Sequence, residues 1–259
     1  MYHTIDYIVN QNVYFSQRAY SKQQYDQVNA PPLIENNDNS NLYFSAAKKD
    51  TYLGNSHHDA AGNDYFAQPF TPSIFLVPGF QEVIPKNHEQ AIGFAQEAFR
   101  LMTGKELPEN VLIEIHPRAG FRLIHSRFGQ WNEGIQGFSI NGHKRKLIFI
   151  RETDLCSMLI TIGHEIGHVN SDTLPNAHDE EAKAFAFTIE WANILKKFDI
   201  GGVGSSINDQ IEFNPARNGL HDIAFAFVDF MAKKGRKSLE LHDDLVKKYV
   251  SIFNPLYNK

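Results

Sequence analysis

Two histidines separated by one helical turn constrain this chain more than any other feature. His164 and His168 stand in the run LCSMLITIGHEIGHV, where apolar side chains recur at helical spacing. Residues four positions apart project from the same side of a helix, so both imidazoles would point in one direction. Two nitrogens at that spacing can chelate one zinc ion. The pattern therefore predicts a helix over 154–170 that carries two ligands of Zn²⁺.

The neighbouring residues fit the same helix. Thr153 is expected to cap it, and the acidic Asp154 suits the positive end of the helix dipole. Glu165 would lie beside the metal without binding it, where it can accept a proton from zinc-activated water. Gly163 and Gly167 share another face, which predicts close approach of a neighbouring element. The alternative, two histidines without a metal, would leave polar rings on an apolar helix in need of partners.

The third metal ligand is expected on a second helix, over about 178–197. The candidates at its start are His178, Asp179, Glu180 and Glu181. Lys183 marks the side expected to face solvent; Glu180 lies about 60° and Glu181 about 160° from it. Glu181 would then point inward, where a carboxylate needs a partner or a metal. The short link through Pro175 makes the two helices antiparallel, so we expect Glu181 to join His168 at the ion and Glu180 to be dispensable.

The combination GHEIGHV … DEEAKAFAF resembles the gluzincin type of HEXXH zinc metallopeptidase, in particular the compact minigluzincins and the ImmA/IrrE-like peptidases. The resemblance covers about residues 140–197, and more loosely 74–233. It implies that His164, His168 and a glutamate of the following helix bind zinc, and that Glu165 is the general base. The metzincin pattern is excluded, because Ser171 and Leu174 stand where that class needs glycine and histidine.

A zinc-dependent metalloendopeptidase acting on a protein or peptide is the expected function. Two alternatives stay open: an ImmA/IrrE-like regulatory peptidase that cleaves a repressor, and a non-catalytic module in which zinc joins two helices. Glu165 favours catalysis, since a structural zinc site needs no acid beside the metal. A peptidase also needs a donor for the developing oxyanion. Some larger gluzincins supply it from a downstream helix, where His221 is the first candidate and His242 the second; each also fits an ordinary surface or cap histidine.

The composition argues against some classes of binding partner and of cellular location. The formal charge of −5, without a basic block, argues against nucleic acid or an anionic membrane. No stretch approaches the roughly 18 apolar residues that span a bilayer, and no secretory signal is evident. Cys156 is the only cysteine, which excludes an internal disulfide and fits a reducing compartment. A cytoplasmic protein is the resulting expectation.

The chain divides by composition into two parts. Residues 1–70 are rich in Asn, Gln and turn residues, and we interpret them as an N-terminal arm or possible pro-segment over the cleft. Its His57-His58-Asp59 run fits a solvated loop better than a second metal cluster. Residues 71–259 form the expected zinc metallopeptidase domain. Its predicted class is α+β: a small mixed or antiparallel sheet packed on the HEXXH helix, followed by the glutamate helix and further C-terminal helices.

The remaining elements are predicted from local signals. Strands are expected over 73–77, 111–115 and 147–150, and helices over 87–104, 219–233 and 239–253. Asn141-Gly142 lies between GIQGFSI and KRKLIFI and favours a hairpin with a type I′ turn. By analogy with zinc peptidases, residues 134–140 are expected to be an edge strand along which substrate adds as a further strand.

Overall fold

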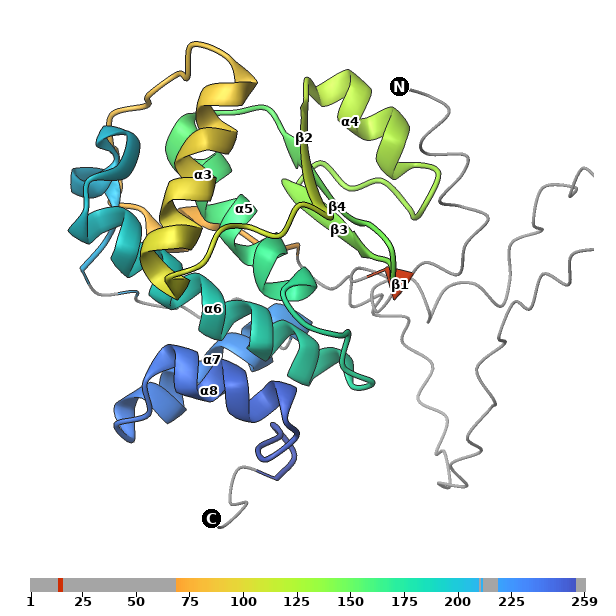
Figure 1. Ribbon diagram of the computed structural model, residues 1–259, viewed down its shortest axis with the longest axis vertical. Coiled ribbons are helices and arrows are strands. Elements are labelled where there is room, and N and C mark those ends of the chain that lie inside the picture. Colours follow the sequence, from red (N-terminus) through yellow and green to blue (C-terminus); the bar gives the residue numbers. More distant parts are fainter. Residues whose placement is uncertain (1–13, 16–68, 210, 212–218, 255–259) are drawn as a thin grey trace, which may run out of the picture.

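The structure is a computed structural model and describes residues 14–15, 69–209, 211 and 219–254. Its class is α+β, as predicted, with helices on both sides of a small mixed sheet (Figure 1). No described helix combines the length and apolarity needed to cross a bilayer. The helices are α3 (His88–Thr103), α4 (Arg118–His125), α5 (Leu155–Val169), α6 (Ala177–Lys197), α7 (Leu220–Lys233) and α8 (Ser238–Val246), with short 3₁₀ turns η1 (Pro72–Phe75), η2 (Ile200–Gly202) and η3 (Gly204–Ser206).

The sheet has the strand order β1-β3-β4-β2. Strands β3 (Gly137–Asn141) and β4 (Lys146–Arg151) form the predicted antiparallel hairpin, and β2 (Val111–His116) runs parallel to β4. The expectation of an open edge along residues 134–140 is wrong at one end. Strand β1 (Tyr14–Phe15) pairs antiparallel with Ile140 and Asn141, so the N-terminal segment contributes a strand there.

Alternation along the hairpin separates two cores. Ile148 and Ile150 of β4 face the main core, which includes buried side chains of α3, α5, α6 and α7. Leu147 and Phe149 face the opposite way, into a smaller core with Phe121 of α4. The helix α5 is therefore supported by one face of the sheet and α4 by the other (Figure 1).

The β3 residues that face α5 hold it at three points. A Cβ on Gly137 would lie 2.6 Å from Thr161 Cγ2, so only glycine allows this approach without a shift. The Ser139 side chain forms a hydrogen bond with the Glu165 carboxyl group. Asn141 Nδ2 donates to Ser171 O, just beyond the helix, at 2.8 Å. These alternate residues of one strand fix how α5 lies along the sheet.

Close contacts also fix α5 against α6. A Cβ on Gly163 would lie 2.4 Å from the buried ring of Trp191, and one on Gly167 would lie 2.9 Å from Ala184 Cα. Close packing at both glycines was predicted from the sequence and is confirmed. On its other sides α6 packs against α7 and α8, so it lies between helices (Figure 1).

Two local predictions, of a strand and of a turn type, are wrong. Residues 73–77 form no strand; Pro72–Phe75 is a 3₁₀ turn, and Leu76 makes only an isolated bridge to Ile207. The hairpin turn is not type I′, because Asn141 pairs with Lys146 across a four-residue loop, and neither Asn141 nor Gly142 has positive φ. Asn141 stays extended while its amide binds the end of α5.

The caps of two helices also differ from expectation. Asp154, and not Thr153, caps α5: its carboxylate accepts from Ser157 N at 2.9 Å, and the Thr153 hydroxyl donates to that same carboxylate. The last helix ends at Val246, seven residues before the predicted end, because Lys248 adopts a positive φ of 59°. Helix α4 was not predicted.

Candidate metal centre

Three helices bring four potential ligands to one buried point. His164 and His168 come from α5, Glu181 from the first turns of α6, and His221 from the start of α7. Each of these residues is at most 5% exposed. The Nε2 atoms lie 3.4 Å (His164), 3.6 Å (His168) and 3.1 Å (His221) from the same atom, Glu181 Oε2. Three imidazoles thus converge on one carboxylate oxygen.

The distances from His164 and His168 fit the coordination sphere of a metal ion, and the distance from His221 is shorter. Zinc binds nitrogen and oxygen at about 2.0–2.2 Å, which places tetrahedral ligand atoms about 3.3–3.6 Å apart. Ligand atoms of His164, Glu181 and His221 all lie within 4.8 Å of one another. Glu181 Oε2 is buried and makes no hydrogen bond of acceptable geometry. A cation would satisfy this oxygen, so the donor set fits Zn²⁺.

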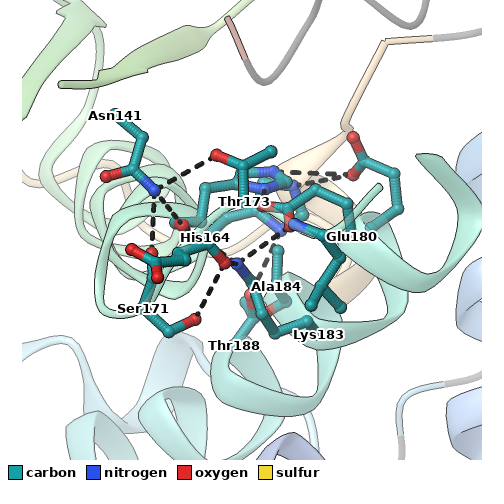
Figure 2. A network of polar contacts seen from close by, with 12 residues as sticks. Asn141, His164, Ser171, Thr173, Glu180, Lys183, Ala184 and Thr188 are labelled. Atoms are coloured by element: carbon teal, nitrogen blue, oxygen red, sulfur yellow. Dashed lines mark hydrogen bonds and ion pairs between the residues drawn. The ribbon is translucent and has the colours of Figure 1, made fainter. Parts of the chain in front are cut away.

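The outer ring nitrogens of both α5 histidines are held by α6. His164 Nδ1 lies 3.2 Å from Thr188 Oγ1, whose hydroxyl donates to Ala184 O at 2.7 Å. Because that hydroxyl proton is used, Thr188 accepts the Nδ1 proton of His164. His168 Nδ1 donates to Glu180 Oε1 at 2.9 Å (Figure 2). Both contacts leave Nε2 as the lone-pair nitrogen that faces Glu181, as a metal ligand requires.

Glu180 and Lys183 do not face solvent, and that part of the prediction for α6 is wrong. Glu180 is 3% and Lys183 0% exposed. The Lys183 ammonium lies 2.9 Å from Glu180 Oε2 and donates to the carbonyls of His168 and Asp172 at 3.1 and 3.2 Å. A helix covered on several sides has no polar face for its charges, so the two residues neutralise one another inside the protein. Glu180 is consequently no longer expected to be dispensable.

The other sequence candidates lie elsewhere. Asp179 accepts from Ser251 Oγ and Ile252 N at 2.9 and 2.7 Å, and the His178 ring packs against Phe253. His242 is buried on α8 beside Phe187. It is not one of the described residues that contact Glu181 Oε2. His57, His58 and Asp59 lie outside the described residues. Of the four acidic and histidine candidates at the start of α6, Glu181 alone lies against the Nε2 atoms of the three imidazoles, whereas Glu180 contacts His168 at Nδ1.

Glu165 lies in α5 directly after His164 and is 2% exposed. Ser139 hydrogen-bonds its side chain, while the buried Oε2 atom has no hydrogen-bond partner. Burial raises the pKa of this carboxyl above its ordinary value, against the charges of His168 and His164. Glu165 therefore combines one oxygen without a hydrogen-bond partner with a raised pKa, which are properties that a general base requires.

Burial also sets the protonation of the ligands. It lowers the pKa of His164 to about 3 and raises the pKa of Glu181 to about 7. For His168 burial acts in the same direction as for His164, but the carboxylates of Glu181 and Glu180 outweigh it and raise the pKa to about 9. Without a cation the cluster therefore retains a proton between His168 and Glu181, which a metal would displace.

The pKa values of Glu180 and Lys183, the ion pair behind His168, are both lowered. Burial acts to raise the pKa of Glu180, but the hydrogen bond from His168, the charge of Lys183 and the Leu174 N–H lower it overall. Leu174 N donates to Glu180 Oε2 at 2.7 Å. Burial lowers the pKa of Lys183, against the charge of Glu180.

Phe70 covers one side of the centre. Its ring stacks on His164 with centroids 3.9 Å apart and planes 8° from parallel, and it also contacts Phe185. Phe70 is 5% exposed. Phe70 thus shields one of the candidate metal ligands. Nothing in the sequence singled out this phenylalanine, because the contact joins positions 94 residues apart in the chain.

No protein-family model, curated protein or solved structure matches the chain. The resemblance to the gluzincins thus stays a prediction that rests on the motif and on the geometry of the centre.

Proposed function

We propose that the protein is a zinc-dependent metallopeptidase that hydrolyses peptide bonds in a protein or peptide substrate. The observation that carries the proposal is the convergence of three imidazole Nε2 atoms on Glu181 Oε2, with Glu165 next in sequence to His164. When bound, zinc lowers the pKa of a water molecule and polarises the scissile carbonyl. A cytoplasmic location and the absence of nucleic-acid partners remain part of the proposal, on the sequence arguments above.

Each residue has a distinct proposed role. His164, His168 and Glu181 would hold the metal from two antiparallel helices. Glu165 would accept the proton of the attacking water and pass it to the leaving amine. The hydrogen bond to Ser139 on β3 fixes the Glu165 side chain relative to the sheet before substrate arrives.

His221 supports two different readings of the site. As a donor to the oxyanion it would complete a catalytic centre with three protein ligands and an open fourth position. As a fourth ligand it would close the coordination sphere and favour the non-catalytic zinc module. The observation behind the second reading is that ligand atoms of His164, Glu181 and His221 all lie within 4.8 Å of one another.

Metal analysis of three variants tests the proposal. Glu181→Ala and His164→Ala should each lose zinc and the ability to digest an unfolded protein such as casein. His221→Ala should keep zinc and lose rate if the site is catalytic, whereas loss of zinc in this variant would support the closed module. A purified wild-type chain that takes up no zinc would overturn both readings.

A further inference from the structure

A buried ion pair lies behind one of the proposed metal ligands. Glu180 and Lys183 are both on α6, three residues apart, and their charged groups are 2.9 Å from each other. Neither is used as a ligand or as a proton carrier in the proposed reaction. Burying two charges costs several kcal/mol per ion before their mutual attraction is counted, so the pair is a poor device for stability alone.

The contacts of Glu180 show what the pair does. One carboxylate oxygen accepts from His168 Nδ1 at 2.9 Å, and the other accepts from Leu174 N at 2.7 Å and from Lys183. Both oxygens are therefore occupied, and the carboxylate has no freedom to rotate. A fixed acceptor at Nδ1 fixes the plane of the His168 ring and leaves Nε2 for the metal.

Lys183 links this carboxylate to the end of α5. Its ammonium donates to the carbonyls of His168 and Asp172, at 3.1 and 3.2 Å (Figure 2). Carbonyls in the last turn of a helix lack partners within that helix, and cations there are favourable. The same lysine therefore fixes both the backbone of His168 and the carboxylate that holds its ring.

We propose that Glu180 and Lys183 are positioning residues for the metal centre, which orient the His168 imidazole from the side opposite the ion. The role rests on the proposed function, since it concerns how tightly the centre holds zinc. Loss of a partner behind a ligand typically reduces metal affinity 10- to 100-fold. Glu180→Ala removes the acceptor, and Lys183→Met removes the charge that holds it.

The test is zinc affinity of the full-length chain, measured by competition with a chromophoric chelator, with the Co²⁺ absorption spectrum as a report on ligand geometry. Glu180→Ala and Lys183→Met should each weaken zinc binding about 10- to 100-fold and alter the Co²⁺ spectrum. Glu180→Gln, which keeps an acceptor oxygen and the side-chain shape, should lose less than Glu180→Ala. The matched controls are Asp229→Ala and Lys233→Met, which break an exposed ion pair on α7 and should leave both readouts unchanged.

The outcomes separate the two proposals. A wild-type chain that binds no zinc would overturn the metal centre and this role with it. If the wild-type chain binds zinc, and Glu180→Ala and Glu180→Gln bind it as tightly as wild type, the positioning role alone would be overturned. Should the alanine variant fail to fold, Lys183→Met decides, because an unchanged affinity and spectrum there would refute the role of the ion pair.

Discussion

The contact between α5 and α6 at Gly167 should be sensitive to a single methyl group. An alanine Cβ at this position would lie 2.9 Å from Ala184 Cα, 3.0 Å from Ala184 O and 3.0 Å from Phe187 Cβ. Ordinary carbon contacts begin near 3.5 Å, so the helices must separate by about 0.5 Å or more. All three atoms are backbone atoms or a first side-chain carbon, so none of them can rotate away. Gly167→Ala therefore displaces α6 itself.

The expected magnitude follows from two opposing effects. Overpacking a well-filled core costs about 1–3 kcal/mol, whereas replacing glycine by alanine inside a helix gains about 0.5–1 kcal/mol. A net loss of about 1–2 kcal/mol in the free energy of unfolding is expected from these two figures. Because metal sites tolerate only about 0.2 Å in ligand distance, zinc affinity should also fall.

Urea unfolding of the metal-free chain, followed by circular dichroism, measures the first effect, and chelator competition measures the second. The control is Gly93→Ala in α3, where an added Cβ meets nothing within 4 Å. That variant should be slightly more stable than wild type and bind zinc equally. A Gly167→Ala protein that matches Gly93→Ala in both measurements would refute the described packing of α5 on α6.

Two further predictions concern Phe70 and His125. Phe70→Ala should lower the free energy of unfolding by about 3–5 kcal/mol, as for a buried phenylalanine, and should speed the loss of zinc to a chelator because it uncovers His164. The control Phe128→Ala, in the smaller core, should leave the rate of zinc loss unchanged. Equal rates in wild type and both variants would contradict the shielding role of Phe70. Burial lowers the pKa of His125 from 6.5 to about 4. Between these pH values the unfolded chain takes up a proton at His125 and the folded chain does not. The resulting contribution of about 3 kcal/mol to the free energy of unfolding is therefore complete above pH 6.5 and is lost as the pH falls toward 4. Unfolding measured from pH 4 to 7 should therefore depend less on pH in His125→Phe than in wild type, and identical slopes would refute this.

The sequence was most informative where one helix decides the geometry. Helical spacing alone predicted α5, the shared direction of His164 and His168, and the closeness of Gly163 and Gly167 to a neighbouring element. The α+β class and the hairpin of β3 and β4 also followed from local patterns, and the structure confirms them. The placement of Glu181 inward on α6 agrees with the structure as well.

The reasoning about Lys183 failed because a helical wheel contains no information about the neighbours of a helix. The charged residues of α6 were assumed to mark a solvent-facing side, yet Lys183 is buried and donates to carbonyls of His168 and Asp172 at the end of α5. The run AKAFAF, apolar nearly all round, was the signal that could have shown a buried helix. With that signal, Glu180 and Lys183 at i,i+3 would have been expected as an internal pair.

Contacts between distant parts of the chain could not be predicted from the sequence. His221 was one of two downstream histidines that fitted the oxyanion role, and no local pattern links it to Glu181 at a sequence distance of 40 residues. The run 73–77 is short and apolar, and periodicity alone does not distinguish a strand from a turn in so few residues. Tertiary packing decided both.

The central claim is a catalytic zinc ion with Glu165 as the base, and one comparison tests it most directly. Wild type and Glu165→Gln are purified in parallel, and zinc content and the rate of digestion of an unfolded protein are measured on the same samples. The account predicts about one zinc per chain in both proteins and a rate at least about 100-fold lower in the variant. A Glu165→Gln protein that digests at the wild-type rate, or that has lost its zinc, would contradict it.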